Sequence, residues 1–114
     1  MTIQIFGTKK CNDTKKAERF FKERGVKYHF VDLSQKGISP GELENISRAV
    51  ALEDLLDTQS KVYKKRNLQY MVFDVRDILL EEPLLFKTPV VRNGKAVTVG
   101  NAPGTWEAWL REMR

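Results

Sequence analysis

The alternation of apolar and polar residues predicts a strand, a helix and a second strand at the start of the chain. Residues 2–6 alternate with a period of two, which indicates a strand. Residues 12–24 follow a helical period and end at Gly25, a typical helix stop. The apolar face of this helix would consist of Ala17, Phe20 and Phe21. Residues 26–31 predict another strand, so this order favours a parallel, right-handed strand pair.

The middle of the chain, from about residue 38 to 82, carries helical patterns only. Ser39-Pro40-Gly41-Glu42 is a capping box with proline at the first helical position, and it predicts a helix to about Val50. The inward residues of that helix would be Leu43, Ile46 and Val50. Three more short helices are predicted over residues 52–56, 60–67 and 74–81. We interpret the whole stretch as a helical insert that ends near Pro83.

The end of the chain predicts a hairpin and a last helix. Residues 89–99 form two strand patterns joined by Asn93-Gly94, the pair that type I′ turns favour. The helix would run from about Pro103 to Met113. Its inner face would consist of Trp106, Trp109, Leu110 and Met113, with both tryptophans in the core. The order β-α-β, helical insert, β-β-α predicts an α/β fold, a four-stranded mixed sheet flanked by helices in the thioredoxin-like arrangement.

Size and composition predict one domain over residues 1–114. A chain of 13.2 kDa with 41% hydrophobic residues can bury a core without a disulfide or metal. No apolar run could span a membrane, no secretory leader is visible, and the single cysteine fits a reducing compartment. We therefore expect a cytoplasmic protein.

The net charge of +5 is interpreted as a solvated basic surface. Basic residues are not interleaved with aromatic ones as in proteins that stack bases, so nucleic-acid binding is not expected. His29 stands without suitably spaced ligands, so no metal site is expected either.

Cys11 is the residue most suited to chemistry. It precedes the first predicted helix, where the backbone amides of Asn12, Asp13 and Thr14 and the helix dipole favour a thiolate. Nearby lysines such as Lys10 add to this effect, and the Asp13 carboxylate opposes it. The alternative is a buried, inert cysteine. The Thr14 hydroxyl could donate to the sulfur or cap the helix, and both interpretations stay open.

The motif Cys11-Asn12-Asp13-Thr14 has no second cysteine, so any redox cycle needs an external thiol. Thr88-Pro89 opens the third predicted strand opposite Cys11. In this fold we expect a cis bond there, which would turn the backbone of Thr88 toward a bound thiol or peptide. The alternative is a trans proline that begins the strand.

These features together resemble the glutaredoxin-related arsenate reductases and the Spx-type transcriptional regulators. The resemblance covers nearly the whole chain. It rests on Ile5-Phe6-Gly7-Thr8-Lys9-Lys10-Cys11, the helical insert, residues 55–63, Thr88-Pro89-Val90-Val91 and Val99-Gly100. It implies that Cys11 is the nucleophile, that glutathione is a co-substrate with no cofactor bound, and that three arginines hold the oxyanion.

The arginines of the reductases are missing from this sequence. Gln59 and Thr88 stand where two of them are usual, and the stretch Gly100-Asn101 lacks the third. Arg92 is the nearby candidate replacement. Charge-assisted arginine contacts are what bind a tetrahedral oxyanion well, so efficient arsenate reduction is not expected.

The sequence therefore supports two hypotheses. The first is a thiol-based oxidoreductase-like protein that forms a mixed disulfide with glutathione or a protein thiol. Its nucleophile would be Cys11, and the residues that dock the partner would be Thr88, Pro89, Gln59, Lys10 and Arg92. The second is a regulator that binds a protein partner, as Spx-type regulators bind RNA polymerase.

Overall fold

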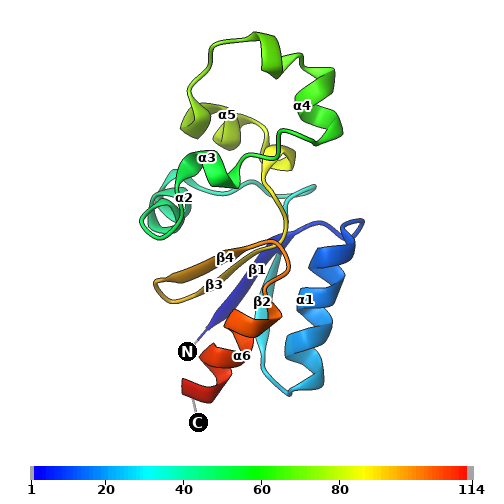
Figure 1. The fold of residues 1–114 in the computed structure, drawn as a ribbon, viewed down its shortest axis with the longest axis vertical. Coiled ribbons are helices and arrows are strands. Elements are labelled where there is room, and N and C mark those ends of the chain that lie inside the picture. Colours follow the sequence, from blue (N-terminus) through cyan, green and yellow to red (C-terminus); the bar gives the residue numbers. More distant parts are fainter. Residues whose placement is uncertain (1, 113–114) are drawn as a thin grey trace.

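The computed structural model describes residues 2–112 and contains one four-stranded mixed sheet within that range. The strands are β1 (Ile3–Gly7), β2 (Tyr28–Asp32), β3 (Val90–Asn93) and β4 (Ala96–Val99), in the spatial order β2-β1-β3-β4. β1 pairs in parallel with β2 and antiparallel with β3, and β3 pairs antiparallel with β4. The predicted α/β, thioredoxin-like architecture is confirmed (Figure 1).

One face of the sheet is covered by α1 (Asn12–Glu23) and α6 (Pro103–Glu112). Their buried side chains form an aromatic cluster with β1 and β3 residues. It includes Ile3, Ile5, Ala17, Phe20, Phe21, Val91, Trp106, Trp109 and Leu110. Both tryptophans lie in the core as predicted, and Trp106 Nε1 donates to Thr98 Oγ1 at 2.8 Å. Met113, predicted for the same face, lies outside the described residues.

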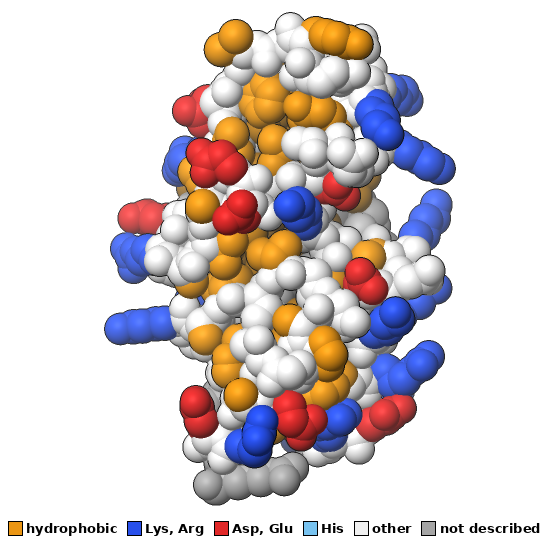
Figure 2. All heavy atoms as spheres, in the orientation of Figure 1, with side chains coloured by type: hydrophobic (Ala, Val, Ile, Leu, Met, Phe, Trp, Pro, Cys, Tyr) orange, Lys and Arg blue, Asp and Glu red, His pale blue; other side chains and the backbone are white. Residues whose placement is uncertain are grey.

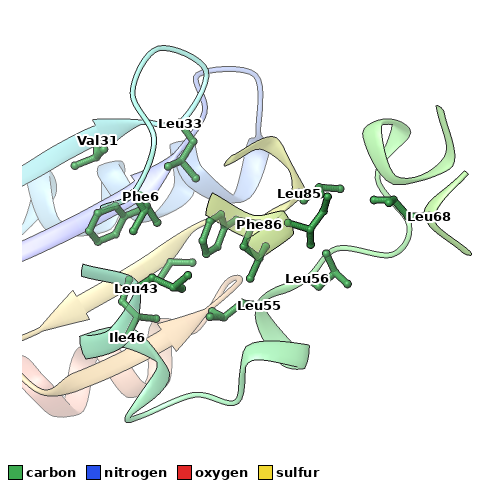
Figure 3. Packing of buried hydrophobic residues seen from close by; sticks show 14 residues of the cluster. Phe6, Val31, Leu33, Leu43, Ile46, Leu55, Leu56, Leu68, Leu85 and Phe86 are labelled. Carbon is green, nitrogen blue, oxygen red and sulfur yellow. The ribbon is translucent and has the colours of Figure 1, made fainter. Parts of the chain in front are cut away.

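The other face is covered by the helical insert. Its elements are α2 (Pro40–Ser47), α3 (Leu52–Leu55), α4 (Lys61–Lys65), η1 (Leu68–Tyr70), α5 (Val75–Glu81) and η2 (Pro83–Leu85). Figure 3 shows Leu43 and Ile46 of α2 near Phe6 of β1, whereas Leu68 of η1 lies further from the sheet. The predicted capping box is present, because Ser39 Oγ accepts from Glu42 N and Glu42 Oε1 accepts from Ser39 N. No helix among the described residues is long and apolar enough to cross a membrane.

The hairpin turn differs from the prediction. Asn93 pairs with Ala96, so the two turn residues are Gly94 and Lys95 instead of Asn93 and Gly94. Gly94 has a φ of +60°, and neither Asn93 nor Lys95 has a positive φ. Positive φ at the first turn residue alone is the pattern of a type II′ turn. The predicted type I′ turn was therefore wrong, because the register keeps Asn93 within the strand.

Candidate functional site

Cys11 lies in the loop between β1 and α1, where its backbone begins the helix. It is the residue before the first helical turn, with φ −81° and ψ 120°. Its amide donates to Thr8 O at 3.2 Å, and its carbonyl accepts from Lys15 N at 3.1 Å. Because its side chain does not cap the helix and is half-buried, the sulfur remains available to a partner.

Thr88 contacts the sulfur from the other side of the site, 77 positions further along the chain. Thr88 Oγ1 donates to Cys11 Sγ at 3.0 Å, and the thiol in turn lies 3.7 Å from Thr88 O, which can accept its proton. The Thr88-Pro89 bond is cis, as expected, and Pro89 is buried. Pro89 O accepts from Gly100 N at 2.8 Å, so this segment is held to the loop before α6.

Thr14 lies in the first turn of α1, three residues after Cys11. It is fully buried, and its hydroxyl has no hydrogen-bond partner within residues 2–112. A Cβ at Gly7 would collide with its side chain, so the end of β1 approaches Thr14 closely because residue 7 is glycine. Thr14 is therefore not a capping residue. Its hydroxyl lowers the pKa of Cys11 because it lies close enough to donate a hydrogen bond to the thiolate form of the sulfur.

The balance of these contacts lowers the pKa of Cys11 below that of a free thiol. Burial acts in the opposite direction and raises it, but the hydroxyls of Thr14 and Thr88 and the amides of Thr14 and Asp13 outweigh burial. Donors to a sulfur favour its anionic form, which is the nucleophilic form of cysteine. The structure therefore places the thiol of Cys11 where it ionises more easily.

The remaining residues predicted for the site do not all contact Cys11. Asn12 begins α1 and is exposed, and Lys10 is exposed in the loop beside Cys11. Gln59 is exposed in the turn before α4, where its backbone amide donates to Asp57 Oδ1 at 3.0 Å. Arg92 points toward the hairpin turn, because its Nε donates to Gly94 O at 2.8 Å. No hydrogen bond within residues 2–112 joins Gln59 or Arg92 to Cys11.

A cavity of about 410 Å³ opens beside the Cys11 loop. It is lined by Thr8, Lys9, Lys10, Asp32, Ser34, Gln35 and Leu84. Asp32 accepts from the amide and hydroxyl of Ser34, at 3.0 and 2.6 Å, and these bonds lower the pKa of its carboxyl. Asp32 and Ser34 were not identified from the sequence as part of the site. The order Asp32-Leu33-Ser34 at the end of a strand is nevertheless a signal for a turn closed by the Asp32 side chain.

The described residues hold no cluster of three or more His, Cys, Asp or Glu side chains that could bind a metal ion. The chemistry that the site offers is that of a single activated sulfur. Its neighbours are two threonines, a cis proline and a cavity with lysines at its edge.

Comparisons with known proteins place the chain in a family. Over 105 residues the chain is 29% identical to "Global transcriptional regulator Spx 2" of Oceanobacillus iheyensis, covering 88% of this chain and 77% of that protein. A solved structure described as the YffB protein has 25% identity and a TM-score of 0.82, covering 93% of this chain and 96% of that one. An arsenate reductase (ArsC) related protein from Brucella melitensis has 27% identity and a TM-score of 0.69, covering 97% and 96%. Residues 6–109 match the ArsC family, and the protein is a member of that family.

Proposed function

We propose that the protein is a thiol oxidoreductase of the ArsC family that uses Cys11 to form a mixed disulfide with glutathione. The observation that supports this best is the contact between Thr88 Oγ1, the donor, and Cys11 Sγ at 3.0 Å. The hydroxyl favours the thiolate, and the lowered pKa of Cys11 agrees with that role.

The reaction follows thiol–disulfide exchange. The Cys11 thiolate attacks the glutathione sulfur of a glutathionylated substrate, the S–S bond breaks, and the substrate leaves as a thiolate that takes a proton from water. A second glutathione, as thiolate, then attacks the mixed disulfide. Oxidised glutathione leaves, and Cys11 returns to its thiolate form. In the net reaction the glutathionylated substrate and one free glutathione give the substrate thiol and oxidised glutathione.

The cavity beside the loop fits the non-sulfur part of such a substrate. Lys9, Lys10 and Asp32 line a space of about 410 Å³, in which the carboxylates of a tripeptide would meet two positive charges and its ammonium group one negative charge. Leu84, 40% exposed, offers an apolar contact in the same cavity. Glutathione carries two carboxylates, one ammonium group and the methylene groups of its γ-glutamyl residue, so its chemistry matches this lining.

Arsenate is a poorer match for the same site. Gln59 is exposed and, within residues 2–112, makes no hydrogen bond with Cys11, and Thr88 brings a neutral hydroxyl to the sulfur. A tetrahedral dianion needs charged, bidentate donors to displace its water. Neutral donors around the sulfur suit a neutral disulfide better than an oxyanion.

The test is turnover of a glutathionylated peptide with glutathione, followed as release of the free peptide thiol. Wild type should turn over, Cys11→Ser should be inactive, and Lys10→Gln should raise KM with little change in kcat. Lys36→Gln, a change of an exposed lysine outside the cavity lining, is the matched control. A Cys11→Ser variant as active as wild type would overturn the proposal.

The second candidate is a regulator that binds a protein partner such as RNA polymerase. It is favoured by one observation: Tyr70, Met71 and Val72 are 83%, 55% and 103% exposed at the end of η1. Figure 2 shows hydrophobic side chains at that end of the molecule. Contiguous exposed apolar residues are typical of interaction sites.

Binding of purified RNA polymerase distinguishes the two candidates. The regulator hypothesis expects wild type and Cys11→Ser to bind equally and Val72→Asp to lose binding. The oxidoreductase proposal expects no binding and full turnover in Val72→Asp.

A further inference from the structure

A second cavity lies at the other end of the sheet from Cys11. It has a volume of about 280 Å³ and is lined by Asn45, Arg48, Arg92 and Lys95. Arg92 pairs with Gln4 near the start of β1, whereas the loop to Cys11 follows the end of that strand. Figure 1 shows α2 next to the tip of the β3–β4 hairpin, the two elements that form this cavity.

The sheet face changes from apolar to polar at this cavity. Side chains two residues apart on a strand share a face, so Val90 and Arg92 of β3 lie on the same side, as do Phe6 and Gln4 of β1. Val90 and Phe6 are fully buried beneath the insert. Arg92 and Gln4, the next pair along, are half-buried and open to solvent. The pairing of β1 with β3 thus fixes Gln4 beside Arg92, which lines this cavity.

The positive charges at this cavity are barely compensated. Arg92 Nε donates to Gly94 O at 2.8 Å, which fixes the guanidinium and leaves its two terminal nitrogens free. Within residues 2–112 neither Arg92 nor Lys95 has an ion pair. Arg48 pairs with Glu44 at 3.4 Å, with both side chains mostly exposed, so water weakens that pair. Two cations without an ion pair, Arg92 and Lys95, therefore line this cavity within residues 2–112, together with Arg48, which also donates to Asn45 Oδ1 at 3.3 Å.

We propose that this cavity binds a phosphate-bearing anion, independently of Cys11. Guanidinium groups bind phosphate oxygens in a planar, two-pronged arrangement, and an ammonium adds a point charge. The two cations without an ion pair carry more charge than a single carboxylate can neutralise, whereas a phosphate or diphosphate matches them and can also contact the exposed Arg48. The amide of Asn45 adds a neutral donor to the same cavity.

The experiment is calorimetric titration of the full chain with inorganic phosphate and with pyrophosphate at low salt. Arg92→Gln is compared with Arg19→Gln, which removes the same charge from an exposed position on α1. Pyrophosphate should bind wild type and Arg19→Gln alike and bind Arg92→Gln about tenfold or more weakly, the usual effect of losing a charged hydrogen bond.

Two results would overturn the proposal. One is the absence of binding of either anion to wild type. The other is equal weakening by Arg92→Gln and Arg19→Gln, which would mean attraction to the overall positive charge only. Cys11→Ser should bind pyrophosphate as wild type does, so this test stands apart from the redox assay.

Discussion

Removing the Thr88 hydroxyl tests directly what stabilises the Cys11 thiolate. Thr88→Val keeps the branched shape of the side chain and deletes the donor that lies 3.0 Å from Cys11 Sγ. Thr88 is half-buried, so the added methyl group fills the space of the hydroxyl without a new cavity. The main consequence should be the loss of one hydrogen bond to sulfur.

The expected change in the pKa of Cys11 follows from the negative charge of the thiolate, which accepts the hydrogen bond from Thr88. A hydrogen bond to a charged group contributes about 1.5–3 kcal/mol. Cys11 is half-buried, so water replaces part of the lost contact, and we take the lower limit of that range. This corresponds to a ratio of thiolate to thiol that is about tenfold lower at a given pH. The pKa of Cys11 should therefore be higher in Thr88→Val than in wild type.

The assay is alkylation of Cys11 by iodoacetamide over a range of pH, together with the ultraviolet absorbance of the thiolate. The midpoint of the pH profile is the decisive quantity, because a thiolate of higher pKa is also a stronger nucleophile, which offsets part of the rate loss. Thr88→Ser retains a hydroxyl and is the matched control. Its midpoint should stay close to that of wild type.

Equal midpoints in wild type and Thr88→Val, with circular dichroism showing that both are folded, would refute this reasoning. The 3.0 Å contact would then be a consequence of packing and would not stabilise the anion. The proposed role of Thr88 beside Cys11 would lose its support.

Four further predictions concern the Cys11 site and the start of α2. Folding lowers the pKa of Cys11, so the wild-type free energy of unfolding should rise as pH rises through the folded-state pKa and fall as pH drops through it. Urea unfolding at a series of pH values measures this, and Cys11→Ser should lack the dependence. Gly7→Ala should destabilise the protein by about 1–3 kcal/mol, because the new methyl group collides with Thr14; thermal unfolding measures this. Thr14→Val should leave the free energy of unfolding within about 1 kcal/mol of wild type or raise it, because an unpaired buried hydroxyl is lost, while the iodoacetamide profile shifts to higher pH. Ser39→Ala should cost about 1 kcal/mol in urea unfolding, because the capping bond to Glu42 N is lost.

Local patterns were sufficient to predict the element order. The period-two alternation of β1, the apolar face of α1 and the capping box at Ser39 are each decided by residues close in sequence. The right-handed connection between parallel strands then limits the topology. Cys11 could be singled out for the same reason, because the start of a helix can be recognised from its flanking residues.

Features that depend on register or distant contacts could not be predicted in this way. The turn at Gly94 depends on how Asn93 pairs with Ala96, and a shift of one position changes which residues form it. The direction of Arg92 depends on that turn, because Gly94 O holds its Nε. The contact between Thr88 and Cys11 joins residues 77 positions apart, so only the folded chain brings them together.

Thr14 indicates that the surroundings of Cys11 are not explained by stability alone. A fully buried hydroxyl without a partner costs about 1–3 kcal/mol, and valine would occupy the same space without this cost. Residue 7 is glycine, which has no side chain to pack, and the space that a Cβ would need there is occupied by the Thr14 side chain. Losses of this kind concentrate at functional sites. Since Thr14 and Thr88 both lower the pKa of Cys11 and neither carries a charge, their arrangement stabilises an anionic sulfur without creating a charged pocket for an oxyanion.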